Sequence, residues 1–165
     1  MYSTSKLKKV CKNYLKARRE FLDISNQQNE LFGNDNIVGR IGEFIAIQFL
    51  RNYSRVPIKN LNKTQKGYDL LCNNKKISVK TITCENLTKR TTRIKDPWDE
   101  LVLIELKEGK IEKIGYIVKG RFQKAIRDEF IRSEPYTKLS MLNPGGLIGR
   151  YGKVFTERKF LNKLL

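Results

Sequence analysis

The chain has 165 residues, enough for one domain with its own hydrophobic core, and 39% of them are apolar. Lysine and arginine number 34 against 17 aspartate and glutamate. The formal net charge of +17 favours a polyanionic partner, nucleic acid before a membrane surface or an acidic protein. The sequence contains no histidine, which excludes Ser-His-Asp and Cys-His catalysis, and its three scattered cysteines make a structural zinc site a poor fit.

Location is predicted from what the sequence lacks. Its longest apolar stretch, around residues 44–50, is too short to span a bilayer, and the N-terminus has no apolar signal region. An odd number of cysteines suits a reducing compartment. We therefore expect a cytoplasmic protein with no membrane partner.

The first half of the chain predicts two helices. Residues 1–34 form a basic N-terminal segment, helical over 4–24, which is a dimer element, a DNA arm or a packed helix. Residues 36–52 predict a second helix with a broad apolar face. Gly39, Gly42 and Ala46 recur on it at spacings of three and four, which favours close packing against a sheet. Glu43 is the acidic residue of this helix.

Strands follow the second helix. Four are predicted over 68–72, 76–83, 100–106 and 113–118, with 56–59 as a weak fifth. A third helix over 120–132, an irregular Pro- and Gly-rich stretch and a short helix capped by Thr156 complete the chain. This order predicts a single α/β (α+β) domain over 1–165, with a mixed four- to five-stranded sheet flanked by helices. Its core is 36–118, and 119–165 is a helix plus a basic Gly-rich C-terminal segment.

The stretch "GYDLLCNNKKISVKT", residues 67–81, carries one carboxylate and a lysine on two adjacent strands. A two-residue type I′ turn at Asn73-Asn74 would pair Asp69 with Ser78 and place both on one face with Lys80. A four-residue turn would set Asp69 opposite Lys80, whereas a three-residue turn would reverse the parity. An ordinary cross-strand ion pair of Asp69 and Lys80 is the mundane alternative.

Phosphodiester hydrolysis needs a carboxylate-bound Mg²⁺ and benefits from a cation beside the attacking water. The succession of "GRIGEFIAIQFL", "KGYDLL", "ISVKT" and "DELVLIEL" resembles the PD-(D/E)XK nuclease superfamily, which includes type II restriction endonucleases and junction resolvases. The resemblance covers residues 36 to about 118 and implies a restriction-endonuclease-like core.

Functional residues follow from the resemblance position by position. It implies that Glu43 and Asp69 bind Mg²⁺, or Mn²⁺ in its place, together with the main-chain carbonyl of Val79, and that Lys80 is the catalytic lysine. The sequence departs from the family at Ser78, where a second motif carboxylate is usual. Ser78 can hydrogen-bond a water on the metal but adds no charge.

Two basic regions are candidates for contacts with the nucleic-acid backbone. They comprise Lys89, Arg90, Arg93 and Lys95 after the Lys80 strand, and Arg150 and Lys153 near the C-terminus. The expected function is a Mg²⁺-dependent DNA endonuclease, foremost a type II restriction endonuclease acting as a homodimer, with a cognate DNA methyltransferase encoded elsewhere. The alternatives are a nuclease for branched DNA, as in junction resolvases, and a nucleic-acid-binding protein without catalysis on the same fold.

Overall fold

A computed structural model describes residues 17, 20, 21, 24, 37–54, 58–60, 67–83, 92–107, 110–131 and 136–165. Residues 17, 20, 21 and 24, which are the described positions of the N-terminal segment, are helical, as predicted. The role expected for the rest of that segment, and the positions of Lys89 and Arg90, fall outside the described residues. None of the described helices combines the length and apolar character needed to cross a membrane.

The described strands form a mixed sheet in the order β1-β2-β3-β5-β6-β8. Their bounds are β1 Ile58–Asn60, β2 Leu70–Cys72, β3 Lys75–Thr83, β5 Glu100–Lys107, β6 Lys110–Val118 and β8 Lys153–Phe155. Strands β3 and β5 run parallel, and the other described neighbours run antiparallel. A second, two-stranded sheet joins β4, Thr92–Arg93, to β7, Tyr136–Thr137.

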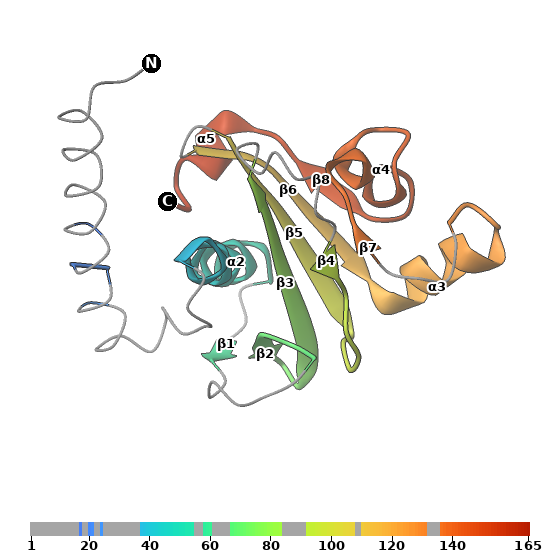
Figure 1. Ribbon diagram of the computed structural model, residues 1–165, viewed down its shortest axis with the longest axis horizontal. Coiled ribbons are helices and arrows are strands. Elements are labelled where there is room, and N and C mark those ends of the chain that lie inside the picture. The colour runs from blue at the N-terminus through green and yellow to red at the C-terminus, as the bar shows by residue number, and fades with distance from the viewer. Residues whose placement is uncertain are drawn as a thin grey trace, which may run out of the picture.

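Helices cover both faces of the large sheet (Figure 1). One core lies under α2, Ile37–Ser54, and α5, Arg158–Leu161. The other lies under α3, Lys119–Arg127, the 3-10 helix η1, Leu139–Leu142, and α4, Leu147–Tyr151. Strand β5 runs between the two cores, and its residues 101–104 are fully buried, which is why their apolar run is continuous. The predicted α+β fold with a mixed sheet between helices is confirmed.

The β2–β3 hairpin closes through the predicted turn. Asn73 and Asn74 have φ values of 49° and 62°, the left-handed values that a type I′ turn requires, and Cys72 pairs with Lys75. Leu70, Ile77 and Val79 point into the core under α2, as the alternation predicted.

The C-terminal part differs from the prediction at four elements. Strand β8 pairs with β6 and adds a sixth strand, and α4 lies within the stretch expected to be irregular. Helix α3 ends at Arg127 rather than near 132, because Glu129 adopts a φ of 55° that no helix accommodates. The cap of α5 is Glu157, one residue beyond the expected Thr156.

Helix α2 approaches β3 closely at Gly42. A Cβ atom added to Gly42 would lie 1.7 Å from the Oγ1 atom of Thr81 and 2.9 Å from its Cβ atom. The side chain of Thr81 is β-branched and stiff at χ1, so it cannot turn aside cheaply. The small residue predicted to permit close packing therefore sets the distance between helix and sheet.

We predict that Gly42→Ala destabilises the fold by about 1–3 kcal/mol, because the new methyl group forces α2 away from β3. Denaturant unfolding followed by circular dichroism measures this. Gly120→Ala on α3 is the matched control, since an added Cβ there meets nothing within 4 Å. That control should be neutral or stabilising by up to about 1 kcal/mol, and a Gly42→Ala protein as stable as the control would contradict the close approach.

Candidate active site

Asp69 immediately precedes β2, at the edge of β3 that faces β2. Its N–H donates to the carbonyl of Ile77 at 2.9 Å, and Leu70 also pairs with Ile77. Asp69 and Leu70, two successive residues of one strand, thus face the single residue Ile77 of the other, as in a β-bulge. The prediction that Asp69 pairs with Ser78 is therefore wrong by one residue. The carboxylate compensates for the lost strand pairing: Oδ2 accepts a hydrogen bond from the Val79 N–H at 2.6 Å.

The carbonyl of Val79 shares this open edge of β3. The N–H and C=O of one strand residue point to the same neighbouring strand. Because the Val79 N–H points to Asp69, its carbonyl faces the same edge, where β2 no longer covers it. Within the described part of the chain, the side-chain contacts of Asp69 fall on Oδ2, which leaves Oδ1 for a further ligand.

Lys80 joins Asp69 from the next position on β3. Its Nζ atom lies 3.8 Å from Asp69 Oδ2, and the two side chains are 19% and 28% exposed. A partly exposed pair of this geometry stabilises the fold little. The structure thus contains the predicted contact between Asp69 and Lys80, and the side chain of Lys80 remains partly accessible to solvent.

Glu43 adds a second carboxyl group from α2. Burial, followed by the charge of Asp69, raises the pKa of Glu43 to about 8, while Lys80 and Arg40 act in the opposite direction. Glu43 therefore lies close enough to Asp69 and Lys80 for all three to interact. The predicted trio forms one cluster, which we call the edge cluster: Glu43, Asp69, Lys80 and the carbonyl of Val79.

Arg40 is a neighbour of the edge cluster that sequence reasoning missed. It lies three residues before Glu43, hence on the same face of α2, and its residue is only 5% exposed. A buried guanidinium is costly unless charge or hydrogen bonds compensate it. The signal in the sequence was the Arg40–Glu43 spacing in the segment "GRIGE".

Ser78 lies beside the edge cluster but is enclosed. Its residue is 0% exposed, and its hydroxyl has no hydrogen-bond partner among the described residues. Ser78 follows Ile77 and precedes Val79, both of which face α2, so its side chain points to the opposite face. A role for Ser78 as a donor to the catalytic water stays a prediction, and it requires water to reach this hydroxyl.

The basic segment after β3 lies near the edge cluster. A Cβ atom on Gly67, whose φ is 100°, would lie 2.4 Å from the Asp96 carbonyl oxygen, so this segment packs against the chain two residues before Asp69. Arg93 and Lys95 are exposed there. With Lys119 and the buried Trp98 they line a hollow of about 470 Å³, which we call the basic hollow.

The C-terminal basic residues lie elsewhere. Lys153 is on β8, three strands from β3, or roughly 14 Å at the usual strand spacing. Its Nζ donates to the Tyr53 hydroxyl at 3.0 Å. Arg150 is on α4, across the sheet from α2, with its guanidinium 4.9 Å from the centre of the Phe130 ring. The structure does not bring either residue to the edge cluster.

The edge cluster has the donors that a hard divalent cation takes. The described residues hold no group of three or more His, Cys, Asp and Glu side chains that could bind a metal. Mg²⁺, however, is commonly held by one or two carboxylates and keeps several waters. Two neighbouring carboxyl groups, one with its pKa raised to about 8, form a site whose charge a cation would compensate. The residues therefore fit Mg²⁺ with a small number of protein ligands.

Comparison with family models and with curated proteins finds no match to this chain. The geometry of the edge cluster is therefore the basis for any functional assignment.

We predict that stability in the absence of metal falls as the pH rises from about 4.5 to about 8, because the folded chain keeps the Glu43 proton over a range in which the unfolded chain has released it. Glu43→Gln removes this dependence. It should unfold like the wild type near pH 4.5 and be more stable by roughly 2–4 kcal/mol at pH 9.

Urea unfolding in EDTA across this pH range tests the prediction. Glu157→Gln is the control, since Glu157 is exposed and makes no capping hydrogen bond with its side chain. Parallel stability profiles for the wild type and Glu43→Gln would show that Glu43 is not buried beside Asp69.

Proposed function

We propose that this protein is a Mg²⁺-dependent endonuclease that hydrolyses phosphodiester bonds of DNA. The observation that carries the proposal is the convergence of Glu43, Asp69 and Lys80 at the edge of β3 beyond its pairing with β2. The resemblance of residues 36–118 to PD-(D/E)XK nucleases supports the same assignment, and the net charge of +17 suits a polyanionic substrate.

The metal would be held by Asp69, Glu43 and the Val79 carbonyl. A cation bound there would polarise the scissile phosphate and lower the pKa of a water molecule. The Val79 N–H fixes the orientation of Asp69 through Oδ2. Glu43 would bind in its ionised form, so the cation must displace the proton that its raised pKa retains at neutral pH.

Lys80 would act on the water and the phosphate. Its ammonium group, 3.8 Å from Asp69 Oδ2, can orient the attacking water and compensate the negative charge that develops on phosphorus oxygens. The water would release one proton to solvent while its oxygen forms a new bond to phosphorus, the phosphorus–oxygen bond to the leaving nucleotide breaks, and the leaving oxygen receives a proton from solvent. Arg40, buried beside Glu43, would position that carboxylate.

The finer assignment is a type II restriction endonuclease. Cleavage of both strands at a defined site calls for two edge clusters, so we propose a homodimer together with a DNA methyltransferase that protects the host. Cleavage of branched DNA is the alternative within the same chemistry. Sequence-defined fragments from plasmid DNA would favour restriction, whereas cleavage confined to a four-way junction would favour resolution.

A second candidate function is nucleic-acid binding without hydrolysis. The observation in its favour is Ser78, which occupies the position of the usual motif carboxylate and is enclosed. Binding that persists across Mg²⁺ and Mn²⁺ without cleavage of plasmid, junction or RNA would establish this function and exclude the first.

We predict that Asp69→Asn, Glu43→Gln and Lys80→Met each reduce Mg²⁺-dependent plasmid cleavage by at least ~100-fold, because each removes a charge that the transition state uses. Gel assays of supercoiled plasmid measure the rates. Lys110→Met is the matched control for Lys80→Met, since Lys110 is exposed at the start of β6. Wild-type rates in the three site variants would exclude the edge cluster as the active site.

The basic hollow generates a separate prediction on binding. The double variant of Arg93→Ala and Lys95→Ala should reduce the steepness of the plot of log binding constant against log salt concentration by about 2. The reason is that the variant forms two fewer phosphate contacts and therefore releases fewer counterions when it binds. Fluorescence anisotropy with labelled DNA in EDTA measures the slope. The double variant of Lys159→Ala and Lys163→Ala, exposed residues near the C-terminus, removes the same charge and should leave the slope nearly unchanged.

A further inference from the structure

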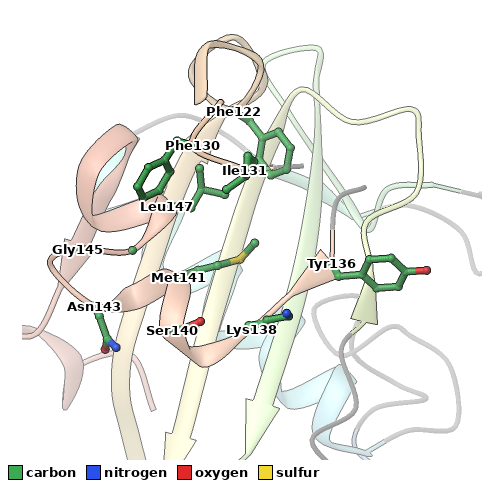
Figure 2. A pocket seen from close by; sticks show the side chains of 11 residues that line it. Phe122, Phe130, Ile131, Tyr136, Lys138, Ser140, Met141, Asn143, Gly145 and Leu147 are labelled. Atoms are coloured by element: carbon green, nitrogen blue, oxygen red, sulfur yellow. The ribbon is translucent and has the colours of Figure 1, made fainter. Parts of the chain in front are cut away.

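A second hollow lies on the face of the sheet opposite α2, between the end of α3, η1 and the start of α4. Its volume is about 810 Å³, within the usual range for small-molecule sites. Figure 2 shows its two unlike ends. Phe122, Phe130 and Ile131 lie at one end and Lys138, Ser140 and Asn143 at the other, with the side chain of Met141 between them. We call this the aromatic hollow.

The side chains at the aromatic end are held by contacts with their neighbours. Phe122 is 3% exposed and packs edge-on against Trp98, with ring centres 5.4 Å apart. Phe130 is held by Arg150 over its ring and by Tyr151 at 5.5 Å. The Tyr151 hydroxyl in turn donates to Asp128 Oδ2 at 2.9 Å. A ring fixed in this way can stack on a planar ligand without losing much side-chain entropy.

The polar end offers both donors and acceptors. Ser140 and Asn143 are exposed and carry a hydroxyl and an amide, the groups that read the edge of a nucleobase. Among the described residues that line this hollow, Lys138 is the charged one. A planar, apolar-faced ligand attached to a negative charge therefore fits better than a cationic or a purely apolar one.

The aromatic hollow is a neighbour of the basic hollow. Phe122 lines both the aromatic hollow and the basic hollow. Tyr136, at the rim, pairs through β7 with Arg93 on β4. Beyond Arg93 the same segment reaches Asp96, which packs against Gly67 near Asp69. A strand gripped by Arg93 and Lys95 can thus extend to both sites.

We propose that the aromatic hollow binds an unpaired nucleobase of a DNA strand whose backbone lies along the basic hollow. This inference rests on the proposed function and, of the two substrates considered there, favours branched DNA with unstacked bases over the duplex that a restriction endonuclease cleaves. A base inside a duplex is stacked on both sides and does not enter such a hollow without being extruded.

Gly145 is a suitable position for a substitution that fills the aromatic hollow. It lines the hollow, its φ is not in the left-handed region, and an added Cβ meets nothing within 4 Å. Gly145→Trp should therefore occupy the space without disturbing the fold. Gly120→Trp is the matched control, because Gly120 is equally open but lines neither hollow.

The experiment measures binding by fluorescence anisotropy in EDTA, so that it does not depend on cleavage. The probes are a labelled single strand, the same strand paired to its complement, and the same strand with abasic central positions. Gly145→Trp should weaken single-strand binding by about 10-fold or more, as expected for the loss of base stacking. It should change duplex and abasic binding by less than about 2-fold, and Gly120→Trp should bind all three probes as the wild type does.

Three results would overturn the proposal: wild-type affinity of Gly145→Trp for the single strand, equal losses on all three probes, or conversion of a dimer to a monomer in analytical ultracentrifugation, which would make the hollow a contact between two copies. Circular dichroism checks folding. If Gly145→Trp does not fold, Phe130→Leu must show the same selective loss. Because no metal is present, failure here leaves the plasmid-cleavage result to decide the proposed nuclease activity separately.

Discussion

The contact between Gly42 and Thr81 is the constraint on which the edge cluster depends. Because Gly42 adds no side chain of its own between α2 and Thr81 of β3, the helix lies low enough for Glu43 to interact with Asp69 and Lys80. The same closeness partly buries Glu43 and raises its pKa to about 8. Tight packing and a perturbed carboxyl group are therefore one feature, and a helix held farther from β3 would give a weaker site for a cation.

Local patterns predicted the parts of the fold that depend on local geometry. Asn73-Asn74 predicted the two-residue turn, since Asn tolerates the left-handed φ that this turn needs. The small residues of α2 predicted the close approach to a sheet, and the unbroken apolar run of β5 predicted its burial on both faces. The meeting of Asp69 and Lys80 followed from the hairpin, although through a bulge at Asp69 rather than through the predicted pairing with Ser78.

The features that sequence reasoning missed depend on contacts between distant segments. Strand β8 has three residues and is held in place by pairing with β6, about 40 residues earlier in the chain. It is too short to show an alternation of apolar and polar residues in the sequence. Arg40 reads as an ordinary helix charge until its burial is known. The aromatic hollow combines residues from α3, η1 and α4, and Arg150 and Lys153, grouped together in the sequence, separate onto α4 and β8.

The short Asn73-Asn74 turn also has a consequence for the order in which the molecule is assembled. A hairpin with a two-residue loop closes on the microsecond scale, because little chain entropy is lost, whereas the parallel pairing of β3 with β5 must wait for a longer connection to close. The bond from the Val79 N–H to Asp69 belongs to the hairpin alone. We therefore expect the nascent chain to form half of its edge cluster locally and early, and to complete it only when α2 docks and delivers Glu43.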